Sequence, residues 1–339
     1  SGGRLAETIE RDGGRHIALD VKAKNPLTVP ARVSALRRAL AQAKPDLVHF
    51  RSRVPGWLFT LANRALRLPF VSTVHGFNSV NAYSRVMTTG QRVICPSTAV
   101  VAYIRQNYRT PEEKIRLVYR GIDPQLFDPG KLDAAFMEQF RKKHGLAGRF
   151  VVLGVGRITP LKGYDALIRA TALARERLPQ IKTVIVGGAE AARAGHEQAL
   201  KRLAEELGVG EQVAFAGSQS KVAEIYACGN VLVSANRDKP EAFGRSMAEA
   251  LAMGCPVIAT RFGGALDIVR EGVNGWFVAP GGDTAQQLAD RLVLASQTML
   301  AGLREDALAR FSLDGMVTQT LAVYDEVLRE ASLPQELRL

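Results

Sequence analysis

The stretch FVVLGVGRITPLKG, residues 150–163, joins an apolar run, a glycine-rich turn and a basic residue just before a segment of helical period. Short Val-rich runs are typical of strands buried in parallel sheets. Gly154 and Gly156 allow backbone N–H groups to approach a ligand, and a helix N-terminus favours anions. Arg157 and Lys162 can neutralise a diphosphate. The stretch therefore predicts a strand, a turn and a helix start that form a phosphate site.

The same alternation of apolar runs and helical segments extends along the chain in both directions, as in a parallel sheet with crossover helices. It predicts an α/β protein with doubly wound parallel sheets. We expect strands within 17–21, 46–50, 70–75, 92–95 and 115–119 in the first half, and within 150–155, 183–186, 213–216, 231–234, 257–260 and 276–278 in the second.

The length of 339 residues suits two domains, each with its own core. Between Gly121 and Gly148 the pattern changes to turns and a polar helix, which indicates the boundary. We expect a first domain at 1–147 and a second, which contains the phosphate site, at 148–315. A C-terminal helix and tail at 316–339 is expected to return towards the first domain. A hydrophobic content of 47% argues against disorder.

The net charge of +12 is unevenly distributed. Residues 1–150 contain 25 Lys and Arg against 11 Asp and Glu, whereas the remaining residues contain 20 against 22. A basic first half predicts an anionic partner, either a membrane surface or an acidic acceptor. We expect no nucleic acid, because aromatic residues make up only 6% and no zinc-finger, RNP or helix-turn-helix pattern occurs.

Cysteine usage and hydropathy predict the compartment. Cys95, Cys228 and Cys255 are isolated, and no apolar run approaches the length of about 20 residues that a membrane helix requires. We therefore expect a cytoplasmic protein, with peripheral contact at the inner membrane face as a further hypothesis. Residues 51–67 allow two interpretations: a basic helix on an anionic membrane, or a crossover helix that buries Trp57, Leu58, Leu61 and Ala65.

A second stretch, PEAFGRSMAEALAMGCPVIA at 240–259, predicts the chemistry. Glu241 precedes a helix that opens at Gly244, and Glu249 lies about one and a half turns inside it. A carboxylate there can accept two hydrogen bonds from ribose hydroxyls, while the first N–H groups of the helix can bind phosphate or sugar oxygens. A dinucleotide site is disfavoured, because the third glycine of GxGxxG is missing after Gly156.

Taken together, these residues resemble the family 4 retaining glycosyltransferases of GT-B fold, also called glycosyl transferases group 1. The resemblance rests on the E-x7-E pair Glu241 and Glu249, on Gly156-Arg157, Lys162-Gly163, Ala259-Thr260 and Gly263-Gly264, and on the segments 73–76 and 272–278. It implies two Rossmann-like domains facing across a cleft. The family's opening strand, glycine-rich loop and helix would precede residue 1, so we expect the first domain to lack them.

The resemblance also implies site residues and an activity. The activity is transfer of a sugar from a UDP- or GDP-sugar to a glycan or lipid-linked acceptor with retention, preferably in lipopolysaccharide or envelope glycan synthesis. No metal and no cofactor are expected, and the sequence contains no Asp-x-Asp pair. A nucleotide-sugar epimerase and a non-catalytic GT-B binding protein stay open as alternatives. The residues that match the family's catalytic positions are His75 and Glu241, and those that match its donor-binding positions are Arg157, Lys162, Phe243, Gly244, Arg245, Ser246 and Glu249.

Overall fold

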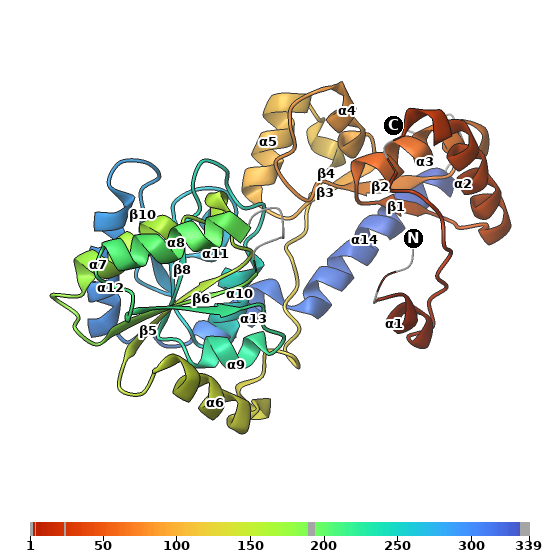
Figure 1. Ribbon diagram of the computed structural model, residues 1–339. Coiled ribbons are helices and arrows are strands. Elements are labelled where there is room, and N and C mark those ends of the chain that lie inside the picture. Colours follow the sequence, from red (N-terminus) through yellow and green to blue (C-terminus); the bar gives the residue numbers. More distant parts are fainter. Residues whose placement is uncertain (1–2, 4, 24, 189–193, 333–339) are drawn as a thin grey trace. The chain divides into compact units, whose positions relative to one another are not determined.

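The computed structural model describes residues 3, 5–23, 25–188 and 194–332, which form two compact α/β units (Figure 1). The first unit combines the described residues of Ser1–Pro96 and Thr318–Leu339 with Val100–Val118. The second unit combines Ser97–Ala99 with Tyr119–Val317. The turn-rich segment after Gly121 and the polar helix that follows it group with the second unit.

The second unit contains a six-stranded parallel sheet in the order β10-β9-β8-β5-β6-β7. Leu153 of β5 is paired with Val184 of β6 on one side and with Leu232 of β8 on the other. The chain therefore winds outward from β5 in both directions, which is the doubly wound order. The strands are β5 (Phe150–Val155), β6 (Ile181–Val186), β7 (Val213–Gly217), β8 (Val231–Ser234), β9 (Val257–Thr260) and β10 (Gly275–Val278).

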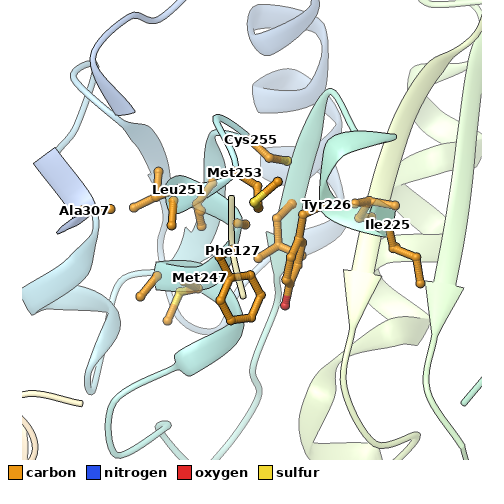
Figure 2. Packing of buried hydrophobic residues seen from close by; sticks show 14 of the residues in the cluster. Phe127, Ile225, Tyr226, Met247, Leu251, Met253, Cys255 and Ala307 are labelled. Carbon is orange, nitrogen blue, oxygen red and sulfur yellow. The ribbon is translucent and has the colours of Figure 1, made fainter. Parts of the chain in front are cut away.

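Helices cover both faces of this sheet. Alternate residues of β5 belong to different cores, with Val152 in one and Leu153 in the other, because successive strand side chains point to opposite faces. Figure 2 shows part of the core that contains Leu153, in which the ring centroids of Phe127 and Tyr226 lie 6.3 Å apart. One core lies under α7 (Tyr164–Ala174), α8 (Ala194–Glu206) and α12 (Thr284–Gln297), and the other under α6 (Ala134–His144), α9 (Val222–Ala227), α10 (Arg245–Ala252) and α13 (Leu303–Phe311).

The first unit contains a four-stranded parallel sheet in the order β1-β2-β3-β4. Its strands follow chain order, so the strand order does not reverse anywhere in the described part of this sheet. His49 and Phe50 of β1 point to opposite faces: His49 contacts Tyr324 of α14, and Phe50 packs on Phe59 of α3. The strands are β1 (Val48–Phe50), β2 (Phe70–Thr73), β3 (Arg92–Cys95) and β4 (Ile115–Leu117), and the longer helices are α2 (Val29–Ala43), α3 (Arg53–Leu66) and α5 (Thr98–Tyr108).

The last helix, α14 (Leu313–Ser332), begins in the second unit and ends in the first. Within the first unit, Glu326 binds both Arg92 and Arg116, and Arg92 also binds Glu330. These pairs fix the helix to β3 and β4. The remaining short helices are α1 (Ala6–Arg11), α4 (Ala82–Arg85) and α11 (Ala265–Ile268), with 3-10 turns η1 (Pro26–Thr28), η2 (Val86–Thr88), η3 (Glu112–Lys114), η4 (Pro129–Lys131) and η5 (Pro160–Lys162).

Most of the predicted elements are confirmed, including all six strands of the second half. The strand predicted at 17–21 is wrong: the segment is irregular, and Ile17 is 41% exposed. Asp20 accepts hydrogen bonds from the N–H groups of Lys22 and Ala23, which turns the chain before a neighbouring strand can pair with it.

The buried face predicted for the crossover helix α3 is only partly correct, since Leu58 is buried and Leu61 half-buried, whereas Trp57 and Ala65 are exposed. The residues that α3 buries are Gly56, Leu58, Phe59 and Ala62. The difference is one of helical phase, because Phe59 packs against the aromatic rings of Phe50 and Phe70. Among the described residues, no helix is long and apolar enough to cross a membrane.

Candidate functional site

The candidate site lies at the carboxyl ends of β5 and β8, where the strand order of the second sheet reverses. In open α/β sheets this position leaves a crevice for ligands. Lys162 lies in η5, between β5 and α7, and Glu241 lies in the loop between β8 and α10. A Cβ atom at Gly163 would lie 1.9 Å from the carbonyl oxygen of Ala235, so only glycine allows the two loops to pack this closely.

Lys162 and Glu241 form an ion pair in which the Lys162 ammonium donates to the Glu241 carboxylate. Their side chains are 23% and 19% exposed, respectively. Burial, together with the nearby charge of Arg157, lowers the pKa of Lys162 to about 8. The ion pair acts in the opposite direction, because it favours the charged ammonium. The charge of Lys162 near neutral pH therefore depends on the groups that surround its ammonium.

The loop that carries Glu241 is supported by the two glycines after β9. The N–H group of Gly264 donates to the carbonyl oxygen of Glu241 at 2.8 Å. A Cβ atom at Gly263 would lie 2.3 Å from the Cβ of Pro240, and one at Gly264 would lie 2.3 Å from the carbonyl oxygen of Phe243. The motif Gly263-Gly264 thus acts on the site by holding the backbone around Glu241.

The start of α10 presents backbone donors beside Glu241. Its N-cap, Gly244, has a φ of 100°, and a Cβ atom there would lie 2.1 Å from the Met247 side chain. In the part of the chain that the structure describes, no acceptor binds the N–H groups of Phe243, Gly244, Arg245 and Ser246. Such N–H groups at a helix N-terminus suit a phosphate or another anion.

Glu249 projects from the second turn of α10 and is held by two donors. The hydroxyl of Tyr226 donates to Oε2 at 3.2 Å, and the Arg245 guanidinium donates to Oε1 at 2.8 Å. Burial raises the pKa of Glu249, while Arg245 and Tyr226 act to lower it. Sequence analysis did not single out Tyr226, since an aromatic residue in a helix facing the sheet is expected in the core, where its ring indeed lies.

The site therefore contains two ion pairs, Lys162 with Glu241 and Arg245 with Glu249. In each pair, a cation at a predicted donor-binding position binds a carboxylate that is predicted to contact the donor sugar or the ribose. Each pair has no net charge of its own.

The second unit brings together all the predicted residues except one. His75 belongs to the first unit, where it follows β2, is exposed, and accepts a hydrogen bond at 3.0 Å from Nε of Arg51. In the described ranges, no group of three or more His, Cys, Asp and Glu side chains is placed to hold a metal ion.

Comparison with known proteins identifies the family. The family described as glycosyl transferases group 1 matches residues 136–306, and Glycosyltransferase Family 4 matches residues 2–126. This chain belongs to the glycosyl transferases group 1 family. The predicted resemblance, the glycosyltransferase class and the GT-B type of fold are thereby confirmed.

Relatives and solved structures agree with this assignment. The glycosyltransferase is 31% identical to a D-inositol 3-phosphate glycosyltransferase from Acidothermus cellulolyticus, over 93% of this chain and 75% of the relative. A glycosyltransferase from Rickettsia africae superimposes with a TM-score of 0.83 at 26% identity, covering 96% of this chain and 88% of that one. Anabaena Alr3699/HepE, solved in complex with UDP-glucose, gives a TM-score of 0.80 at 25% identity, with coverages of 98% and 90%.

Proposed function

We propose that this glycosyltransferase moves a sugar from a UDP- or GDP-sugar to a glycan or lipid-linked acceptor with retention of configuration. The observation that carries the proposal is the set of two ion pairs at the strand-order reversal, beside the N–H groups that open α10. The complex of the HepE structure with UDP-glucose supports a nucleotide-sugar donor. The charge of +12 supports an anionic acceptor, such as lipopolysaccharide or another envelope glycan.

In the proposed complex the two ion pairs exchange partners. Lys162 leaves Glu241 for the diphosphate, with Arg157 beside it, and Glu241 accepts hydrogen bonds from hydroxyls of the transferred sugar. Glu249 accepts hydrogen bonds from the ribose, while Arg245 turns from Glu249 towards the phosphates. The charge that develops on the leaving nucleoside diphosphate is stabilised by these cations and by the N–H groups of 243–246. His75 is assigned to the transferred sugar, as the family resemblance implies.

A nucleotide screen and a product analysis test this function. Saturating UDP-, GDP- and ADP-sugars are added in a thermal-shift experiment, where a ligand at 100 times its Kd stabilises the folded state by about 2.7 kcal/mol. The sugar that stabilises most is then used in transfer reactions, with NMR of the anomeric proton in the product. Inversion at that carbon would contradict retention, and epimerisation of the sugar without any acceptor would identify the epimerase instead.

Replacement of Glu249 by Gln is expected to weaken the binding of nucleotide and nucleotide sugar equally. A hydrogen bond to a charged group contributes about 1.5 to 3 kcal/mol, and both ligands contain the ribose. Calorimetric titration with UDP or GDP and with the matching sugar nucleotide measures the two losses. Glu197→Gln is the matched control, because it breaks an exposed ion pair with Lys201 elsewhere in the same unit. A loss confined to the sugar nucleotide would assign Glu249 to the sugar.

Activity on the acceptor is expected to survive chelation. In the proposed complex, basic side chains and backbone donors neutralise the diphosphate in place of a metal ion. Turnover is measured before and after dialysis against EDTA, with and without added Mg²⁺ or Mn²⁺. If EDTA abolishes turnover and either metal restores it, the charge stabilisation assigned to Lys162 and Arg245 is insufficient.

A further inference from the structure

Two aromatic side chains of the first unit are exposed and nearly parallel. Trp57 of α3 and Tyr83 of α4 lie with ring centroids 6.5 Å apart and planes inclined by 10°. They are 37% and 43% exposed. The indole N–H of Trp57 donates to the carbonyl oxygen of Tyr83 at 2.8 Å, which fixes the pair and satisfies its polar edge. What remains towards solvent is flat apolar ring surface held in one orientation.

Arginines surround this aromatic pair. The guanidinium of Arg53 lies 5.4 Å from the ring centroid of Tyr83 and donates to the hydroxyl of Ser84 at 3.2 Å. Arg85 is exposed on the same short helix as Tyr83. Residues 47–111 contain eight arginines and no Asp or Glu at all. A surface with this charge attracts anions, and a planar guanidinium binds phosphate or carboxylate through two parallel hydrogen bonds.

The location of these residues connects them to His75. Arg51 and Arg53 directly follow β1, while His75 and Tyr83 both belong to the connection after β2. The carboxyl ends of parallel strands meet at one edge of a sheet, which is where α/β sheets bind their ligands. Arg51, two residues before Arg53, donates to the ring of His75 at 3.0 Å. The short segment 51–53 therefore contacts both Tyr83 of the aromatic pair and the predicted catalytic histidine.

We propose that Arg51, Arg53, Trp57, Tyr83 and Arg85, which we call the aromatic–arginine face, bind the acceptor. The acceptor is a six-membered sugar or polyol ring that carries a phosphate or carboxylate. The C–H face of the ring packs on Trp57 and Tyr83, and its anionic group binds the arginines. This inference rests on the proposed function, and it adds the place of acceptor binding and the charge of the acceptor.

A membrane surface is the competing occupant, because Trp, Tyr and Arg also favour the headgroup region of a bilayer. The structure favours a ring. The face lies at the sheet edge beside His75, and the indole N–H already has a partner within the protein. Arg64 and Arg67, the other two arginines of residues 51–67, lie at the opposite end of α3. Substitution of Arg64 and Arg67 therefore tests membrane contact by α3 separately from ligand binding at the face.

Tryptophan fluorescence tests the face without any assay of transfer. The chain has two tryptophans, the exposed Trp57 and the buried Trp276, so the difference between the full chain and its Trp57→Phe variant isolates the exposed one. The ligands are glucose 6-phosphate, glucuronate and myo-inositol 3-phosphate, with glucose and inorganic phosphate as single-feature controls. We expect a saturable change with at least one anionic ring, at concentrations at least tenfold lower than with either control, and its loss in Trp57→Phe.

Anionic vesicles of phosphatidylglycerol form the second arm of the titration. If Trp57 responds to vesicles and to none of the anionic rings, the face is a membrane contact and the proposal is overturned. An absence of any saturable response also overturns it. Because neither result depends on turnover, both leave the proposed function intact.

The kinetic arm uses Trp57→Ala with Arg64→Gln as control. We expect Trp57→Ala to raise the KM for the acceptor at least tenfold, with the KM for the nucleotide sugar and its slow hydrolysis unchanged. Arg64→Gln should change none of these values. An unchanged acceptor KM in Trp57→Ala would overturn the acceptor site while leaving the glycosyltransferase function in place. If no sugar nucleotide is turned over by the full chain, the proposed function fails and the fluorescence result still decides ring binding.

Discussion

Replacement of Glu241 by Gln is expected to lower turnover by roughly 100- to 1,000-fold, the range found when one preorganised contact to the transition state is removed. The carboxylate accepts charge-assisted hydrogen bonds from the transferred sugar, and a neutral amide forms weaker ones. The same variant should bind UDP or GDP without its sugar at least as tightly as the parent. This opposite sign follows from the ion pair, because Lys162 no longer has to leave a carboxylate before it reaches the diphosphate.

The loss of turnover and the retained or increased affinity for the plain nucleotide are measured separately. Single-turnover kinetics with saturating sugar nucleotide gives the chemical step, and calorimetry with the plain nucleotide gives affinity. Glu197→Gln removes the same charge from an exposed Lys–Glu pair on α8 and should change neither quantity. If Glu241→Gln weakens plain nucleotide as strongly as it slows transfer, the carboxylate contributes to the nucleotide site as a whole and the partner exchange is wrong.

Replacement of Lys162 by Ala is expected to weaken nucleotide-sugar binding by about 1.5 to 3 kcal/mol, or roughly 10- to 150-fold in Kd. The ammonium lies in a turn at the helix start and is partly exposed, so the fold should be retained. Calorimetry with the nucleotide sugar measures the loss, and circular dichroism checks the fold. Lys201→Ala, on α8, is the control, since its ammonium contacts Glu197 on the same helix and the ring of Phe215 on β7. Unchanged nucleotide affinity in Lys162→Ala would contradict the diphosphate role.

The pH dependence of binding provides a second readout of the same lysine. Its folded-state pKa is lowered to about 8, so the side chain is a cation below that pH and becomes neutral above it. Only the cation attracts a diphosphate. Affinity is therefore expected to be highest below pH 8 and to fall as the pH rises through this value. In Lys162→Arg the fall should disappear, because guanidinium stays charged over this range.

The second sheet could be predicted from sequence because its strands are short apolar runs, most of them rich in Val and Ile, that are bounded by turns. The run at 17–21 is also apolar but forms no strand, since a strand needs a partner and this segment pairs with no described strand; Asp20 instead accepts hydrogen bonds from the N–H groups of Lys22 and Ala23. The phase of α3 was missed for a comparable reason. Which of its apolar residues face inward depends on the aromatic side chains of β1 and β2.

In the site, too, contacts between residues close in sequence could be predicted, whereas contacts between distant residues could not. Glu241 and Glu249 stand in one short stretch, so their relation to the start of α10 is visible in the sequence. The contact between Lys162 and Glu241 joins residues 79 positions apart and depends on β5 and β8 being neighbours. The hydroxyl of Tyr226 reaches Glu249 from a different helix, α9, and no local pattern separates that tyrosine from an ordinary core residue.

The course of α14 bears on how the protein is made. Translation releases β1 to β4 first, yet the carboxylates that pair with Arg92 and Arg116 stand on the second half of α14. When the ribosome has synthesised the chain as far as Val317, every segment of the second unit exists, whereas the first still lacks Tyr324 and Glu326. The unit encoded first is therefore completed last, and a released chain that ends at Val317 should protect its second unit from protease while its first unit is still cleaved.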